Sequence, residues 1–417
     1  MNVAPQLKKP KLVVIGGGAA GFFCAINAAK ANPNLEVTIV EKNNKLLSKV
    51  KISGGGRCNV THACFEIDEL VKKYPRGEKF LKKAFHWFNT KHTVHWFENK
   101  GVQLKIEADG RMFPITDSSQ TIINCLLNEA DACKVKIALN CTIERIQNIN
   151  GKWFLQSNTN TIEADYLCIA AGGFPKLSQF DWLAFSGHSI VSPVPSLFTF
   201  NIPNSTITEL MGICIPQVNI KLSGTKFNVN GPILITHWGF SGPAVLRLSA
   251  LAATELAAKA YQFSITINWL GSIHEAELRE QWQHIRNNHR TQKIGARNPF
   301  GLPNRFWQYL LQTISIPETN NWSEITQTQQ NKLITLLTNY QFNISGKTTF
   351  KEEFVTAGGI ELQEIDANTM ESKKQPNLYF AGEILNIDGI TGGFNFQNAW
   401  TTGFIAAKSI ATKSLEI

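Results

Sequence analysis

A glycine-rich turn between two apolar segments is the feature that most constrains the fold of this chain. Residues 12–15 form a short β-branched run, GGGAAG follows at residues 16–21, and a small-residue helical pattern continues to Ala31. A second alternating run, LEVTIV, ends at Glu41, 20 residues after Gly21. A strand, a glycine turn, a helix and a strand with an acid at this distance predict a βαβ unit that binds a dinucleotide.

Each glycine of this turn has a physical role. Gly16 permits the tight turn, Gly18 lets the backbone approach a pyrophosphate, and Gly21 lets helix and strand pack closely. The unpaired N–H groups and the dipole of the helix N-terminus would stabilise the pyrophosphate. Glu41 would accept hydrogen bonds from the ribose hydroxyls of the adenosine. The motif by itself fits both FAD and NAD.

The C-terminal segment LYFAGEILNIDGITGGFNFQNAW separates these two cofactors. An apolar strand ends at Gly382-Glu383, and Gly392-Gly393 open a second helix. This second helix N-terminus is expected at the same sheet edge, where it could stabilise the negative charge of a reduced isoalloxazine. NAD alone has no use for this loop, so the pattern indicates FAD.

A third glycine-rich loop, SGGGRCN, occupies residues 53–59. Its backbone can lie against a flat ligand while Arg57 supplies charge. The eight cysteines include no Cys-x-x-Cys pair and no zinc-like spacing, so we expect reduced thiols and no metal site. Cys58 fits a packed or flavin-adjacent residue better than a redox thiol.

Composition places the chain among multidomain globular proteins. It has 417 residues, of which 43% are hydrophobic and 18% charged, enough for a sizeable core and more than one domain. No apolar run reaches the roughly 18 residues of a membrane span. The N-terminus lacks the apolar region of a signal peptide, so we expect a cytoplasmic protein without membrane contact.

Several longer motifs resemble one known family. These are SGGGRCN at residues 53–59, AAGG at 170–173, ITHWGFSGPAVLRLS at 235–249, EEFVTAGGIEL at 352–362 and FAGEILNIDGITGGFNFQNAW at 380–400. Together with GGGAAG, they resemble the bacterial FAD-dependent oxidoreductases of the aminoacetone-oxidase-like group, also called NAD(P)/FAD-dependent, whose relatives include bile-acid reductase flavoproteins. The resemblance covers essentially the whole chain.

The resemblance implies an α/β fold with a glutathione-reductase-like Rossmann FAD-binding domain. A β-barrel-like domain that carries a small helical insert would interrupt it. This agrees with the short β-like runs after residue 198 and with the polar, Arg-bearing helical pattern over residues 275–340. We therefore expect the FAD-binding domain at 1–197 and 353–417, the β-rich substrate domain at 198–273 and 341–352, and the insert at 274–340.

The resemblance also implies that Ile143 lies near the adenine. The expected FAD contacts are Gly16, Gly18, Ala19, Ala20, Gly21, Glu41, Lys42, Ser53, Gly54, Gly55, Arg57, Cys58, Ile143, Ala171, Gly172, Gly382, Glu383, Gly392, Gly393, Phe394, Asn395, Phe396 and Gln397. The chain departs from the family pattern in three places. LSQFDWLAF replaces a Gly-Ser-Thr-Gly-Asp-Gly stretch, Asn386 replaces Asp, and His62 replaces Asn.

The first function expected is reduction of an activated double bond of a small molecule by hydride transfer from reduced flavin. His237, in ITHWGFSGP, is the candidate proton donor. NAD(P)H is a possible donor, bound only transiently because no second Gly-x-Gly-x-x-Gly occurs.

The net charge of +9 motivates an alternative. Residues 42–111 hold 15 Lys and Arg against 7 Asp and Glu. The segment is either an ordinary solvated surface or a site for RNA. An RNA-modifying flavoenzyme would reduce uridine to dihydrouridine in structured ribosomal RNA, with Trp87 or Trp96 as stacking platforms. A flavin-bearing scaffold without turnover is the third alternative, and the oligomeric state stays open.

Overall fold

The computed structural model describes residues 9–349 and 355–416. These residues fall into two compact units. Unit 1 is formed by the residues up to Pro195 together with those from 355 on, and unit 2 begins at Ser196 and continues to residue 349. The expected boundary at 352/353 lies outside the described residues.

Unit 1 is built on a parallel five-stranded sheet of order β20-β10-β1-β2-β6. Ile15 on the central strand lies opposite Val40 and Ile169, so the β-branched runs read from the sequence are neighbouring buried strands. This arrangement confirms the predicted Rossmann fold. The strands are β1 (Lys11–Ile15), β2 (Glu36–Val40), β6 (Lys136–Ala138), β10 (Tyr166–Ile169) and β20 (Leu378–Phe380).

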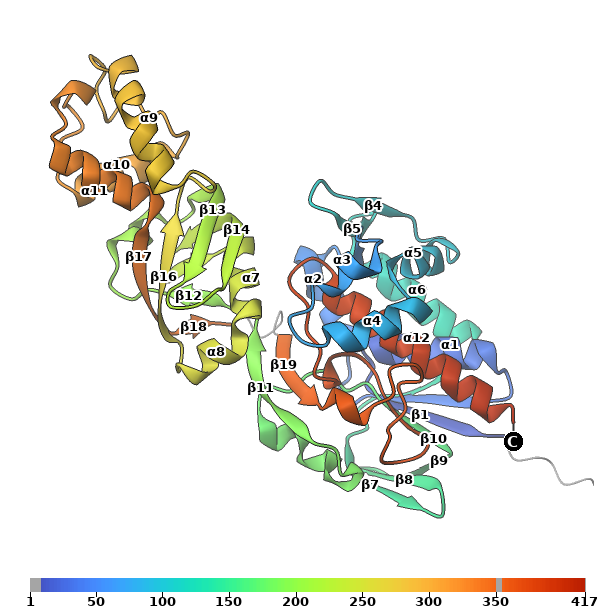
Figure 1. The fold of residues 1–417 in the computed structure, drawn as a ribbon. Helices are drawn as coiled ribbons and strands as arrows, with labels where there is room; N and C mark the ends of the chain where they lie inside the picture. Colours follow the sequence, from blue (N-terminus) through green and yellow to red (C-terminus); the bar gives the residue numbers. More distant parts are fainter. Residues whose placement is uncertain (1–8, 350–354, 417) are drawn as a thin grey trace, which may run out of the picture. The chain divides into compact units, whose positions relative to one another are not determined.

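Helices α1 (Ala19–Ala31) and α12 (Phe394–Ser414) pack side by side (Figure 1). Small residues permit this contact, because a Cβ added at Gly403 would lie 2.7 Å from the carbonyl oxygen of Ala20. The two ends of the chain therefore share one core. The helices after α1 are α2 (Ser48–Gly56), α3 (Ile67–Val71), α4 (Glu78–Trp87), α5 (Thr90–Glu98) and α6 (Ser119–Ala132).

The helical stretch expected over residues 65–100 is divided into three helices. Pro75 and Gly77, whose φ is +93°, separate α3 from α4. Asn89 starts α5 by accepting a hydrogen bond from the backbone N–H of Lys91 at 3.0 Å. Local turn chemistry therefore overrides the continuous amphipathic pattern.

Three small sheets complete unit 1, in the orders β3-β5-β4, β7-β8-β9 and β11-β19. Their strands are β3 (Thr61–His62), β4 (Leu104–Ile106), β5 (Arg111–Pro114), β7 (Ile143–Ile149), β8 (Lys152–Ser157), β9 (Thr161–Ala164), β11 (Ile190–Ser196) and β19 (Val355–Ile360). Short 3-10 helices are η1 (Leu177–Ser186), η4 (Leu362–Glu364) and η5 (Gly382–Ile384).

Unit 2 contains a seven-stranded antiparallel sheet of order β17-β16-β13-β14-β15-β12-β18. Alternating apolar residues of its strands form a second buried core with α7 and the helices after residue 274. Helices α9, α10 and α11 lie together at one end of this sheet (Figure 1). The elements are β12 (Thr199–Asn201), η2 (Thr206–Leu210), β13 (Cys214–Leu222), β14 (Asn228–Thr236), β15 (Gly239–Ser241), α7 (Pro243–Leu251), α8 (Ala253–Ala258), β16 (Gln262–Asn268), α9 (Glu275–Asn288), α10 (Asn304–Thr313), η3 (Trp322–Glu324), α11 (Gln327–Thr338), β17 (Tyr340–Ser345) and β18 (Lys347–Thr348).

No helix in the described ranges combines the length and the apolar character needed to cross a bilayer.

Candidate FAD-binding site

The carboxyl ends of four parallel strands bring four of the sequence-predicted segments to one edge of the sheet in unit 1. Because β20, β10, β1 and β2 are neighbours and point the same way, the residues that follow them meet there. Those residues are Gly382 and Glu383 after β20, Ala171 and Gly172 after β10, Gly16 to Gly18 after β1, and Glu41 and Lys42 after β2. The edge is therefore a candidate dinucleotide site.

The turn at the start of α1 has the features that a pyrophosphate requires. A Cβ added at Gly21 would lie 1.9 Å from the carbonyl oxygen of Gly16, so only glycine allows this close packing. A Cβ added at Gly18 would meet no atom within 4 Å. No side chain caps the helix at Gly18, which leaves the first N–H groups, including those of Ala19 and Ala20, available to an anion.

Glu41 supports the turn from the end of β2. Its Oε2 accepts a hydrogen bond from the backbone N–H of Gly17 at 2.8 Å, and its Oε1 accepts two from Asn43 at 3.0 and 2.9 Å. A carboxylate has about four lone-pair positions, so Oε2 can still accept a ribose hydroxyl. The backbone N–H of Cys141 donates to the Glu41 carbonyl at 2.9 Å, which places the start of β7 at Ile143 two residues beyond this contact.

Lys49 and Thr356 join this edge, although sequence reasoning did not select them. Lys49 Nζ pairs with Glu383 Oε2 at 2.5 Å, and the backbone N–H of Thr356 donates to Glu383 Oε1 at 2.9 Å. The buried Thr356 hydroxyl has no hydrogen-bond partner among the described residues. A Cβ added at Gly173 would lie 2.6 Å from this hydroxyl oxygen, which places it beside the segment after β10. Sequence spacing offers no signal for contacts between positions 334 residues apart.

The SGGGRCN loop forms the end of α2, with Gly54 and Gly55 at positive φ. Arg57, expected to supply charge to the cofactor, stacks on the Phe113 ring at 4.0 Å and pairs with Glu107 at 2.6 Å. Its charge is therefore largely neutralised within the protein. Ser53 turns inward, and its hydroxyl donates to the Val50 carbonyl.

Cys58 follows at φ +61° and is fully buried. Burial raises the pKa of its thiol to about 12, which agrees with a packed residue and not with a reactive thiolate.

The start of α12 contributes a second helix N-terminus, with Gly393 at the cap position and no side-chain cap. The Asn59 amide accepts a hydrogen bond from the Gly393 N–H at 3.0 Å and donates to the Thr61 carbonyl at 2.9 Å, so the loop after α2 touches the α12 turn. Asn395 exchanges hydrogen bonds with the Gly389 backbone. Asn59 was not among the predicted residues.

The remaining predicted residues of α12 differ in exposure. Gln397 is fully buried, and its amide bonds Thr61, Thr93 and Thr401, so it supports the helix from inside. Phe394 stacks on His62 with ring centroids 4.7 Å apart, and Gly392 packs against both rings. Phe396 is only partly buried.

The residues at this edge fit FAD. An uncapped helix start with open space above Gly18 suits a pyrophosphate, and Glu41 suits a ribose. The unpartnered Thr356 hydroxyl offers a hydrogen bond close to Glu383. Lys42 extends across the edge, with its Nζ 5.6 Å from the centre of the Phe174 ring.

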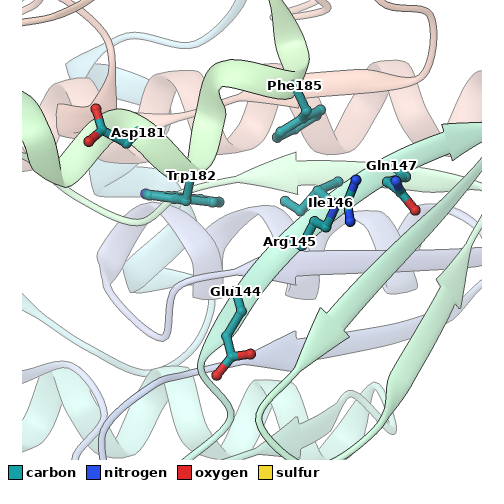
Figure 2. A pocket seen from close by; sticks show the side chains of 7 residues that line it. All are labelled: Glu144, Arg145, Ile146, Gln147, Asp181, Trp182 and Phe185. Carbon is teal, nitrogen blue, oxygen red and sulfur yellow. The ribbon is translucent and has the colours of Figure 1, made fainter.

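A surface hollow of about 280 Å³ lies in unit 1 where the chain departs from the family pattern. Figure 2 shows Trp182 and Phe185 of η1 extending toward Arg145 and Ile146 of β7. Asp181, Glu144 and Gln147 complete its lining (Figure 2). The bulky LSQFDWLAF segment therefore covers the β7-β8-β9 sheet with aromatic rings.

His237 lies in unit 2, in the turn between β14 and β15. Its side chain is exposed and contacts Trp238 edge to face at 4.4 Å. Its role as proton donor stays a prediction.

The two tryptophans expected as stacking platforms differ in their surroundings. Trp87 is 45% exposed but is covered by Lys408, whose Nζ lies 4.4 Å from the ring centre. Trp96 is half-buried: its ring packs on Phe23 and its indole N–H donates to the Asn27 side chain at 3.0 Å, so one face of the ring contacts the core.

The basic segment 42–111 is less positive in the fold than in the sequence. Eight of its 15 cations pair with carboxylates: Lys49, Arg57, Lys72, Arg76, Lys82, Lys100, Lys105 and Arg111. The remaining seven are lysines.

Within the described part of the chain, no three His, Cys, Asp or Glu side chains lie close enough together to hold a metal ion.

Known proteins resemble this chain over nearly its whole length. The family model for the HI0933-like protein Rossmann domain matches residues 10–409. The ribosomal RNA dihydrouridine synthase of Escherichia coli (strain K12) is 30% identical over 96% of this chain and 98% of its own length. The 3-dehydro-bile acid delta(4,6)-reductase of Clostridium scindens is 25% identical over 97% of this chain and 99% of its own.

A solved structure shares the fold. The 3-ketosteroid-delta4-(5alpha)-dehydrogenase of Rhodococcus jostii RHA1 is 12% identical, covers 98% of both chains and superposes with a TM-score of 0.51. The family match, over residues 10–409, includes all four segments at the sheet edge. The chain therefore belongs to the HI0933-like Rossmann family and is an FAD-binding, flavin-dependent oxidoreductase.

Proposed function

We propose that this protein reduces a uridine of ribosomal RNA to dihydrouridine. The observation that carries the proposal is the 30% identity to the E. coli ribosomal RNA dihydrouridine synthase, which spans 96% of this chain and 98% of that protein. A likeness that includes the β-rich unit and its helical insert covers the parts expected to meet a substrate. Such a substrate would place the protein in the cytoplasm.

Bound FAD, once reduced, would supply the hydride that adds to one carbon of the uracil C5–C6 double bond, while a proton adds to the other carbon. The N–H groups at the start of α1 would hold the pyrophosphate, and Glu41 would orient the ribose. We assign the proton to an imidazole nitrogen of His237, which is exposed in unit 2. NAD(P)H would be the electron donor, so that each turnover consumes one NAD(P)H and one proton.

The decisive experiment measures dihydrouridine by mass spectrometry in ribosomal and transfer RNA of the source organism with and without this gene. We expect ribosomal dihydrouridine to disappear in the deletion strain and to return with the gene, while transfer RNA stays unchanged as an internal control. Unchanged ribosomal RNA would refute the proposal. A His237→Ala variant that loses less than about tenfold in rate would remove that residue as proton donor, because general acid catalysis contributes about 10²-fold or more.

A second candidate is reduction of an activated double bond in a small molecule, favoured by the 25% identity to the bile acid reductase. Its test is anaerobic mixing of the reduced holoenzyme with α,β-unsaturated ketones. Reoxidation of the flavin together with unchanged ribosomal RNA would favour this candidate. No turnover with either substrate class would leave the flavin-bearing scaffold.

A further inference from the structure

The helical part of unit 2 carries positive charge that the protein does not neutralise. Residues 281–317 contain five Arg and Lys and no Asp or Glu. None of the five forms an ion pair among the described residues. Arg290, Lys293 and Arg297 are exposed, and their side chains have no hydrogen-bond partner within the described ranges. This concentration of free cations differs from the largely paired segment 42–111.

These three cations lie on the insert loop, residues 289–303 between α9 and α10. Backbone contacts fix the loop: the Ile294 N–H donates to the Asn320 carbonyl at 2.8 Å, and the Gly295 N–H donates to the Glu318 carbonyl at 3.1 Å. The Arg290 carbonyl accepts from the Ser323 N–H at 3.2 Å. The loop therefore has a defined backbone path although it contains no helix or strand.

Buried tryptophans hold the same loop from inside. The Trp307 indole N–H donates to the Ile294 carbonyl at 2.7 Å, and the Trp322 indole N–H donates to the Arg297 carbonyl at 3.3 Å. Both indoles are fully buried. The backbone is thus anchored to a rigid core while the cationic side chains extend outward, which lowers the entropy cost of binding an anion.

The first two carboxylates that follow the loop in the sequence, Glu318 and Glu324, do not neutralise it. Glu318 accepts hydrogen bonds from the Gln308 and Gln312 amides at 3.0 and 3.5 Å. Glu324 accepts from the backbone and side-chain amides of Asn321 at 2.6 and 3.2 Å. Both groups serve local structure, so the three cations remain available.

We propose that the insert loop docks the phosphate backbone of folded RNA through Arg290, Lys293 and Arg297; this inference rests on the proposed function in ribosomal RNA. Arg and Lys side chains on a fixed loop suit phosphates, which positions the RNA without reading its sequence. Each neutralised phosphate adds about 0.9 to the slope of log affinity against log salt. Three contacts account for about 40-fold of the affinity lost between 50 and 200 mM salt.

The test compares two triple variants of the full-length holoenzyme that remove equal charge. One is Arg290→Gln with Lys293→Gln and Arg297→Gln. The matched control is Lys79→Gln with Lys83→Gln and Lys91→Gln, three exposed lysines of the basic segment for which no described ion pair exists. The probe is ribosomal RNA purified from a strain that lacks this gene, and the readouts are affinity at 50 to 200 mM salt and dihydrouridine formed.

We expect the insert-loop variant to lose more than about tenfold in affinity at 100 mM salt and to lower the salt slope by about 2 to 3. Its FAD content and thermal unfolding should match those of the unchanged protein. The lysine control should stay within about threefold of the unchanged protein. A further variant, Arg290→Lys with Arg297→Lys, should retain the salt slope because it keeps the charge.

If the insert-loop variant binds RNA as tightly as the unchanged protein, the inference about the loop is overturned. The proposed function would still stand in that case, provided that the unchanged protein forms dihydrouridine. A larger loss in the lysine control would also overturn it, and would assign the RNA surface to α4 and α5. If the unchanged protein neither binds this RNA nor forms dihydrouridine, the proposed function fails and the inference fails with it.

Discussion

The second and third glycines of the turn at α1, Gly18 and Gly21, should respond differently to the same added methyl group. We consider Gly18→Ala and Gly21→Ala. The first places a Cβ in open space and the second places it 1.9 Å from the Gly16 carbonyl oxygen. The pair therefore separates cofactor binding from packing.

Gly18→Ala should leave the protein without FAD nearly as stable as before. The backbone at Gly18 has φ −96° and ψ −171°, which alanine adopts without strain. The weaker N-cap costs about 1 kcal/mol, and reduced freedom of the unfolded chain offsets about 0.4–1 kcal/mol. In the holoenzyme the methyl would enter the open space above Gly18, where we expect the pyrophosphate to bind. Loss of two hydrogen bonds to a charged group, at about 1.5–3 kcal/mol each, weakens FAD binding by about 150-fold or more.

Gly21→Ala should destabilise the protein itself. The helix must move by about 1 Å to relieve the contact with the Gly16 carbonyl, because real Cβ contacts stay beyond 3.0 Å. Overpacking of this kind costs about 1–3 kcal/mol and can cost more, although a better helix propensity returns up to about 1 kcal/mol. A net loss of about 2 kcal/mol lowers the melting temperature by about 4–8 °C in a unit of this size.

Three measurements on both variants decide the matter: flavin absorbance per polypeptide, FAD titration of the apoprotein, and thermal unfolding of the apoprotein by circular dichroism. The reasoning is refuted if Gly18→Ala binds FAD as the unchanged protein does. It is also refuted if Gly18→Ala lowers the apoprotein melting temperature as much as Gly21→Ala.

Three further predictions concern single residues. Glu41→Gln keeps an oxygen acceptor for the Gly17 N–H but loses the charge-assisted hydrogen bond to the ribose, so the affinity for FAD should fall about tenfold in the FAD titration of the apoprotein. An unchanged affinity would contradict the ribose contact. Burial lowers the pKa of His62 below its usual 6.5, so the unfolded chain binds more protons than the folded protein as the pH falls below 6.5, and the stability of the fold should decrease there. His62→Asn should remove part of this decrease in melting curves recorded between pH 7.5 and 5.5. A variant with the same pH profile as the unchanged protein would contradict this role of His62. Cys58, buried with a thiol pKa of about 12, should resist iodoacetamide in the native protein, while the exposed Cys214 should react. Peptide mass spectrometry measures both reactions, and fast labelling of Cys58 would show that the loop opens.

Sequence alone was sufficient for the βαβ unit and for the second glycine loop near the C-terminus. Strand periodicity, the steric demands of Gly16 and Gly21, and an acid at the end of the next strand all depend on residues close in the chain. The parallel sheet then follows from right-handed crossovers, which bring strand ends to one edge. The expected FAD residues after four of these strands consequently lie together.

Only the tertiary structure revealed the partners of these residues. Glu383 forms an ion pair with Lys49 and accepts a hydrogen bond from the backbone N–H of Thr356, and Arg57 forms an ion pair with Glu107. No local sequence pattern predicts these contacts, because the partners are far apart in the sequence. The same reason explains the charge distribution. In the sequence, the excess of positive over negative residues lies in residues 42–111. In the fold, about half of these cations form ion pairs, whereas the fewer cations of the insert loop remain exposed. An ion pair depends on the distance between two charges in space and not on their separation in the sequence.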